Sequence, residues 1–156
     1  RRVWARRGRR PVAVSSHKYK WLYLYGFVRP TTGDVEWWVA DRVGVALFQQ
    51  VLDAFARNAG AGPDKTVILV LDNAGWHVSR KLRLPDGIQF CFLPAYTPEL
   101  QPAERLWPLT NEAVANRPFQ TIDQLADCLD RRCAALTDHP DIIRGNTKFH
   151  WWPNES

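Results

Sequence analysis

The chain has 156 residues, of which 46% are hydrophobic and 24% are charged, a balance typical of one compact soluble domain. Its formal net charge of +5 indicates an anionic partner such as nucleic acid. No apolar run approaches the roughly 20 residues that cross a bilayer, and no signal peptide is visible, so we expect no membrane partner.

The N-terminal segment is strongly basic. The chain contains no Met and begins at Arg1, so we interpret it as a fragment of a longer protein. No acidic residue precedes Asp34, and the first 20 positions hold many of the basic residues: Arg1, Arg2, Arg6, Arg7, Arg9, Arg10, Lys18 and Lys20. They form either a solvated arm without a ligand or a surface that contacts phosphates, with Trp4, Tyr19 and Trp21 available for stacking.

The first half of the chain predicts a hairpin followed by a helix. Alternating or continuous apolar and aromatic residues indicate a strand over residues 12–28, and Arg29–Asp34 is typical of a turn. Residues 35–40 return as a second, antiparallel strand. Apolar residues with helical spacing follow from Val45 to Phe55, and the Gly-containing stretch Asn58–Pro63 ends this helix.

The second half predicts two more strands and two more helices. Val67–Leu71 is a short apolar run, typical of a strand buried on both faces, and Ile88–Leu93 is another strand. Pro102 suits the first position of a helix, and a capping box of Thr121 and Gln124 opens the last helix. This order of elements predicts the α/β class, with a mixed sheet flanked by helices.

The three cysteines do not indicate a metal site. Cys91, Cys128 and Cys133 lack paired spacing, and on a helix the last two would point about 140° apart. We therefore expect reduced, buried thiols of a cytosolic protein rather than zinc ligands, even with His139 nearby.

A carboxylate directly follows the buried strand. Asp72 and Asn73 come after Val67–Leu71, and ligand-binding crevices of open α/β sheets lie beyond the carboxyl ends of their strands. Local sequence leaves two interpretations open. Asp72 is an active-site ligand, or the Asp-Asn pair merely caps the next turn.

A second carboxylate enters a helix from a Pro-rich loop. If Pro102 is the first helical residue, Glu104 is the third, where the helix dipole favours its ionised form and cation binding. Pro108 cannot donate a hydrogen bond to the Glu104 carbonyl, so we expect a kink beside Glu104. The alternative is a helix N-terminal charge with no further role.

Together, Asp72 and Glu104 could hold Mg²⁺ through oxygen ligands. Two such ions about 3.5–4 Å apart would activate a water or a 3′-hydroxyl and stabilise the leaving oxygen at a phosphodiester. That arrangement normally requires at least three carboxylates, and Asp72 and Glu104 supply only two of them.

Two motifs in order resemble those of DDE transposases of the mariner superfamily, in particular its bacterial insertion-sequence branch. Val70–His77 contains the Asp-Asn pair, and Leu93–Trp107 contains the Pro-rich approach to Glu104. Arg2–Pro11 is similar to the segment that follows that family's first strand. The resemblance covers nearly the whole chain. It implies an RNase H-like fold and strand cleavage and transfer at transposon ends with Mg²⁺ or Mn²⁺, with residues 1–156 as a partial catalytic domain.

The resemblance also implies roles for the two carboxylates. Asp72 matches the family's second catalytic aspartate and Glu104 its third carboxylate, and both would bind the metal. The first aspartate, in an Asp-Glu pair that ends the first strand, is expected shortly before Arg1, and no residue of this chain matches it. That strand is central in the family, so without it we expect the sheet to be open between its neighbours.

The implied partner is double-stranded DNA that carries terminal inverted repeats. The implied location is the bacterial cytoplasm, at the nucleoid, and the family makes a homodimer plausible. The residues expected to contact DNA are Arg6, Arg7, Arg9, Arg10, Lys18, Lys20, His77 and Arg105. His77 is either close to metal or DNA, or a hydrogen-bonded structural histidine. Gln101 replaces a usual Asn, and Leu109-Thr110 replaces a commonly basic position.

Three functions follow from these expectations. The first is a transposase catalytic domain, an endonuclease that is competent only with its upstream strand. The second is a non-catalytic DNA-binding remnant of a decayed element, and the third is another RNase H-like nuclease. In each case we expect residues 1–156 alone to bind DNA in a salt-sensitive way and to cleave it poorly.

Overall fold

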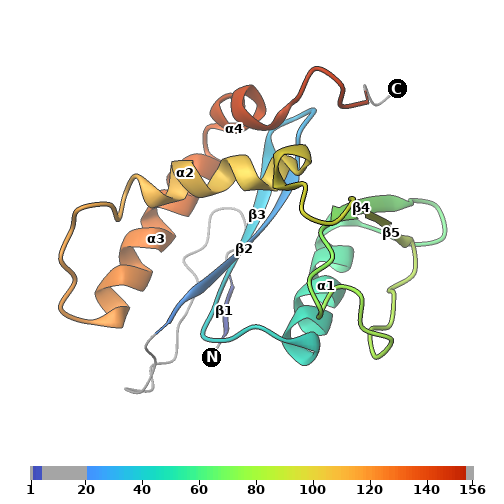
Figure 1. The fold of residues 1–156 in the computed structure, drawn as a ribbon, viewed down its shortest axis with the longest axis horizontal. Helices are drawn as coiled ribbons and strands as arrows, with labels where there is room; N and C mark the ends of the chain where they lie inside the picture. The colour runs from blue at the N-terminus through green and yellow to red at the C-terminus, as the bar shows by residue number, and fades with distance from the viewer. Residues whose placement is uncertain (1, 5–20, 154–156) are drawn as a thin grey trace. The chain divides into compact units, whose positions relative to one another are not determined.

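The computed structural model describes residues 2–4 and 21–153, and the chain divides into two compact units (Figure 1). Unit 1 comprises Arg1–Arg42 and Pro102–Ser156, and unit 2 comprises Val43–Gln101. Both contain strands and helices, so the predicted α/β class is confirmed. The basic positions of segment 5–20, and the first part of the strand expected within 12–28, lie outside the described residues.

Unit 1 contains an antiparallel sheet in the order β1–β3–β2. β2 (Tyr23–Arg29) and β3 (Asp34–Ala40) form the predicted hairpin, and β1 (Arg2–Trp4) pairs with β3. The hairpin turn requires Gly33, because its φ of 81° is unfavourable for residues with a side chain. The Gly33 N–H donates to the Arg29 carbonyl at 2.8 Å.

The helix predicted to open at Pro102 changes type within unit 1. η2 (Pro102–Arg105) is a 3₁₀ turn, and the chain becomes α-helical only in α2 (Leu106–Asn111). Pro108 explains the change, because it has no N–H to donate to the Glu104 carbonyl, which an α-helix would require. The sequence predicted a kink beside Glu104, and the structure shows this change of helix type there.

Two further helices complete unit 1. α3 (Ile122–Thr137) begins at its predicted cap, since Thr121 Oγ1 accepts a hydrogen bond from the Gln124 N–H at 3.2 Å. α4 (Pro140–Thr147) was not predicted, although a proline at the first helical position is a recognised start signal. None of the helices in the described ranges is long and apolar enough to cross a membrane.

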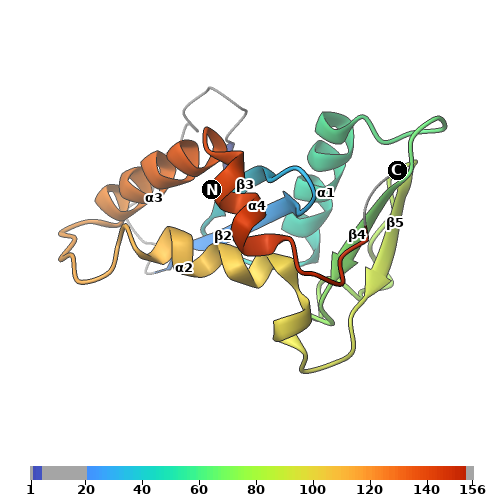
Figure 2. The same cartoon turned by 90° about the horizontal axis from the view of Figure 1, so that it is seen from above.

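α3 and α4 of unit 1 lie against β3 of the hairpin (Figure 2), and the hydrophobic core of unit 1 joins its helices to the hairpin. Its buried members are Trp37, Leu106, Cys133, Leu136 and Ile143. Trp37 Nε1 donates to Thr137 Oγ1 at 3.2 Å, so the indole is satisfied inside the core. Gly26, paired with Trp37 across the hairpin, leaves room for Leu106, because a Cβ there would lie 2.9 Å from Leu106 Cδ1. Leu106 thereby fixes the turn η2, which directly precedes it.

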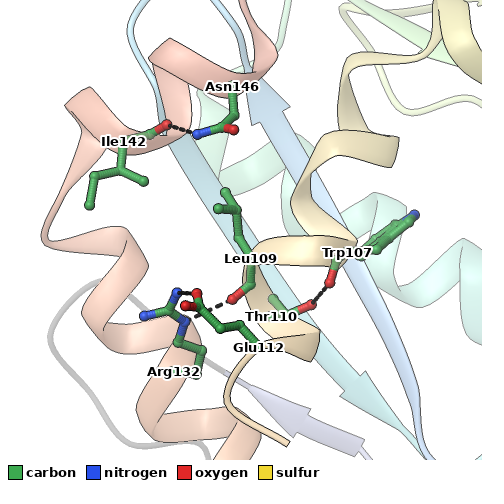
Figure 3. A network of polar contacts seen from close by, with 7 residues as sticks. All are labelled: Trp107, Leu109, Thr110, Glu112, Arg132, Ile142 and Asn146. Carbon is green, nitrogen blue, oxygen red and sulfur yellow. Dashed lines mark hydrogen bonds and ion pairs between the residues drawn. The ribbon is translucent and has the colours of Figure 1, made fainter. Parts of the chain in front are cut away.

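Polar contacts tie α2 to α3 (Figure 3). Arg132 of α3 donates from Nε to the Leu109 carbonyl at 2.8 Å and from Nη2 to Glu112 Oε2 at 2.7 Å. The Leu109 carbonyl lies in the last turn of α2, where carbonyls have no partner within the helix. Thr110 is buried, and its hydroxyl donates to the Trp107 carbonyl at 3.0 Å. Of the pair Leu109-Thr110, which replaces a commonly basic position of the resembled family, Thr110 therefore faces the interior.

Unit 2 consists of α1 (Val45–Ala59) and a parallel pair of strands, β4 (Val67–Leu71) and β5 (Ile88–Phe92). α1 begins at Val45 and β4 spans Val67–Leu71, both as predicted. β5 ends one residue before the predicted Leu93. Buried Leu52 and Ala56 of α1 pack with Ile88 of β5. The strands are parallel with Leu71 opposite Phe92, so their carboxyl ends lie side by side.

The described strands form two small sheets, one antiparallel and one parallel, rather than the single mixed sheet that we predicted. β2 pairs only with β3, and β4 only with β5, so each keeps one edge without a strand partner in residues 2–4 and 21–153. Ile68 of β4 is 63% exposed and only Leu71 of this strand is buried, so the prediction of a strand buried on both faces was wrong. The single mixed sheet is thus absent among the described strands, whereas unpaired strand edges had been expected because no strand of this chain matches the family's first one.

All three cysteines are free. Cys128 and Cys133 are buried as expected, whereas Cys91 on β5 is exposed, so the expectation of burial was wrong there. Burial, followed by the charge of Asp130, raises the pKa of the Cys133 thiol to about 12. The Cys128 thiol donates to the Ala113 carbonyl, with Sγ 3.4 Å from the oxygen. The buried thiols are thus built into the packing of α3.

Candidate active site

Asp72 lies at the carboxyl end of the parallel strand pair of unit 2. It follows Leu71, the last residue of β4, and the Leu71 carbonyl accepts a hydrogen bond from the Leu93 N–H at 2.9 Å. Asn73 Nδ2 donates to the Leu93 carbonyl at 2.8 Å. These two bonds extend the strand pairing past β4 and β5 and so hold Asp72 at the edge where ligands of such sheets bind.

The Asp72 carboxylate is held through one of its two oxygens. Oδ1 accepts the Ala74 backbone N–H at 3.1 Å and lies 2.6 Å from His77 Nδ1. Because an ionised carboxylate only accepts hydrogen bonds, Nδ1 is the donor in this contact. Oδ2 has no hydrogen-bonding partner among the residues that the structure describes, and the side chain is 54% exposed. Oδ2 is therefore available to a ligand.

His77 rests on aromatic rings from two places in unit 2. Its ring centroid lies 4.5 Å from that of Phe48 on α1 and 5.7 Å from that of Trp76, which meets it edge-on. The His77 side chain is only 12% exposed. The imidazole is thus fixed with Nδ1 toward Asp72. Sequence reasoning missed Phe48 as part of the site, because its spacing marked it only as a core residue of α1.

Glu104 occupies the position predicted for it in unit 1, as the third residue of the turn that opens at Pro102. Pro102 and Leu106 on either side of it are buried, so the backbone around Glu104 is anchored to the core. The Glu104 side chain is half-buried and has no hydrogen bond or ion pair with any other described residue. Its carboxylate is therefore also available to a ligand.

Arg105, predicted to contact DNA, is exposed beside Glu104. Its guanidinium carbon lies 5.6 Å from the centroid of the Phe149 ring, within the range of a cation–π contact. The other basic residues predicted to contact DNA, at positions 6, 7, 9, 10, 18 and 20, lie outside the described residues. The sequence analysis did not identify Phe149 as a contact of Arg105.

The donor set fits a hard divalent cation. Asp72 and Glu104 each offer carboxylate oxygen, the ligand that Mg²⁺ prefers, and each belongs to a different unit. Within residues 2–4 and 21–153, no three His, Cys, Asp or Glu side chains come together in a metal-binding group. Asp72 and Glu104 thus each stand as a potential ligand within their own unit.

Comparisons with known proteins agree with these motifs. A model of the DDE superfamily endonuclease family matches residues 1–126, a range that includes both Asp72 and Glu104. The uncharacterized protein y4pE/y4sA of Sinorhizobium fredii is 36% identical over 124 residues, which cover 77% of this chain and 88% of that protein. No solved structure matches the chain significantly.

Proposed function

Because the chain belongs to the DDE superfamily of endonucleases, we propose that it is the catalytic domain of a transposase that cleaves and joins DNA at transposon ends. The observation that carries the proposal is the Asp72 carboxylate, which stands at the carboxyl end of β4 with Oδ1 held by two donors and Oδ2 available. The proposal includes an RNase H-like fold, one catalytic domain formed by both units, and membership of the bacterial insertion-sequence branch of the mariner superfamily.

Divalent metals are generally used in this superfamily, and the two carboxylates suit Mg²⁺ or Mn²⁺. Asp72 Oδ2 and Glu104 would hold the ion, and the third carboxylate of the centre is expected before Arg1. When bound, the metal would activate a water or a 3′-hydroxyl toward the phosphodiester and stabilise the leaving oxygen. The Ala74 N–H and His77 would keep Asp72 oriented, while Glu104 is steadied by the buried residues that flank it.

The proposed partner is double-stranded DNA with the terminal inverted repeats of a transposon, bound in the bacterial cytoplasm at the nucleoid. Arg105, exposed beside Glu104, would contact a phosphate or a base. The basic positions of segment 5–20 would add electrostatic attraction, and bound counterions would be released as phosphates are neutralised.

One specific observation favours a second function. No residue of this chain matches the family's first catalytic aspartate, while the N-terminal segment is strongly basic. A DNA-binding remnant without catalysis would need the basic residues and not the aspartate. The two functions differ in whether any metal-dependent reaction depends on Asp72.

The proposal predicts salt-sensitive DNA binding together with slow, Mn²⁺-dependent reaction at DNA ends. Affinity for a labelled duplex should fall about 10³-fold between 50 and 200 mM salt if some six basic residues contact phosphates. Plasmid nicking and the joining of a 3′-hydroxyl end to a second DNA should both require Mn²⁺. Nicking without joining would indicate another RNase H-like nuclease. Salt-sensitive binding without either reaction would indicate the remnant, and rapid Mg²⁺-dependent turnover would contradict the expected incomplete metal centre.

We predict that His77 acts as a positioning residue for Asp72. His77→Phe keeps a ring on Phe48 but removes the donor to Oδ1, so the carboxylate would lose its orientation. The apparent Mn²⁺ affinity in the nicking reaction should fall about tenfold or more, as it does when supporting hydrogen bonds of metal ligands are removed. His77→Asn restores an N–H close to the position of Nδ1 and should recover most of that affinity. Equal losses in both variants, or a lower thermal midpoint without any change in metal affinity, would make His77 purely structural.

A further inference from the structure

Three aromatic side chains form a cluster directly after α4 in unit 1. The ring centroid of Trp151 lies 5.5 Å from that of Phe149 and 5.6 Å from that of Trp152. The backbone holds this arrangement, because the Phe149 N–H donates to the Thr147 carbonyl at 3.1 Å and the Trp152 N–H to the Phe149 carbonyl at 3.0 Å. Thr147 is fully buried. We call Phe149, Trp151 and Trp152 the aromatic cluster.

The aromatic cluster lies beside the turn that carries Glu104. The Arg105 guanidinium stands 5.6 Å from the centroid of the Phe149 ring, and Arg105 directly follows Glu104 in η2. The family match ends at residue 126, so the cluster belongs to a part of the chain that family membership does not account for. Arg105 therefore connects the aromatic cluster to Glu104, the proposed metal ligand.

The chemistry of the aromatic cluster suits a nucleobase better than an apolar protein surface. Trp151 is 43% exposed, Arg105 lies over the Phe149 ring, and the exposed residues Lys148 and His150 flank Phe149 in the sequence. Aromatic rings interleaved with cations bind single-stranded nucleic acid, because bases stack on the rings while cations contact the backbone. Simple packing of the chain after α4 would not require a large ring to remain exposed in a segment that also carries exposed basic residues.

We propose that the aromatic cluster binds an unpaired base of the DNA, next to the phosphodiester that Glu104 serves. The base would stack on Trp151, and Arg105 would be shared between Phe149 and a phosphate of the same strand. This inference rests on the proposed function, because it takes DNA as the ligand. It adds that the DNA is locally unpaired where it meets η2.

The test compares two labelled DNAs by fluorescence anisotropy with the full 156-residue chain. One is a blunt hairpin duplex, and the other is the same hairpin with a short single-stranded overhang. Trp151→Ala should weaken binding of the overhang DNA about tenfold, since one base stacked on an aromatic side chain contributes an effect of this size. Binding of the blunt duplex should change less than twofold. Trp151→Phe should retain most of the affinity for the overhang, and Ile142→Ala, which removes an exposed apolar side chain from α4, should change neither.

Several results would overturn the inference. Equal affinity of the unmodified chain for both DNAs, or equal losses for both in Trp151→Ala, would mean that the cluster does not recognise an unpaired base. A change of oligomeric state in Trp151→Ala without a change in DNA binding would assign the cluster to contacts between copies of the chain. In each of these cases duplex binding persists and the proposed function stands. If the unmodified chain binds neither DNA, both proposals fail together.

Discussion

Asp72→Asn should lower Mn²⁺-dependent nicking by residues 1–156 roughly 10²–10³-fold, the loss typical of removing one preorganised electrostatic contact from an active site. The substitution changes little in shape, and the amide oxygen can still accept from the Ala74 N–H and from His77. What it removes is the negative charge and one of the two carboxylate oxygens. Single-turnover nicking of supercoiled plasmid at several Mn²⁺ concentrations measures the effect, and added Mn²⁺ should not restore the rate.

Asp86→Asn is the matched control. Asp86 is an exposed aspartate of the same unit, but it precedes β5 and so stands at the opposite end of the parallel pair from Asp72. The same change of charge there should leave nicking within about twofold and DNA binding unchanged. If both variants lose nicking equally, the effect is one of net charge. If Asp72→Asn nicks normally and only the thermal midpoint falls, Asp72 caps the turn after β4 and nothing more.

The local elements of unit 2 could be predicted because each carries a strong local signal. Val67–Leu71 is a continuous apolar run, which predicted the strand although not its exposure, and the residues of α1 repeat with helical spacing. α4 was missed because its apolar side chains are mostly Ile142 and Ile143, two adjacent positions that establish no helical period. Its buried face is defined only by the hairpin and helices on which Ile143 packs.

Sheet organisation and the support of the candidate site could not be predicted in the same way. Strand pairing depends on which strands are available, and no local pattern in β2 or β4 records that an edge lacks a partner. Asp72 and Glu104 stood out because their motifs are continuous in sequence. The orientation of Asp72 depends on His77, and His77 depends on Phe48 of α1, a contact between distant parts of unit 2. Spacing alone carries no information on such a contact.

Leu106→Ala should lower the free energy of unfolding of unit 1 by about 2–5 kcal/mol, the range for truncating a buried leucine. Leu106 is 0% exposed and packs against the hairpin where Gly26 leaves room for it, so an alanine would leave a cavity that the sheet cannot easily fill. Urea unfolding followed by circular dichroism measures the loss. Leu106→Met, which nearly conserves the volume, should cost less than about 1.5 kcal/mol.

Glu104→Gln, two residues before Leu106, should lower nicking and leave the stability of unit 1 nearly unchanged. The Glu104 side chain is half-buried and has no partner among the described residues, so its replacement should change the free energy of unfolding by less than about 0.5 kcal/mol. Nicking should nevertheless fall as it does in Asp72→Asn, because a metal ligand has been lost. A large loss of stability in Glu104→Gln would instead make this carboxylate a structural charge of η2. The two variants together separate structural support from chemistry. Leu106 anchors η2 to the hairpin, whereas the Glu104 carboxylate in η2 is available to bind a metal ion.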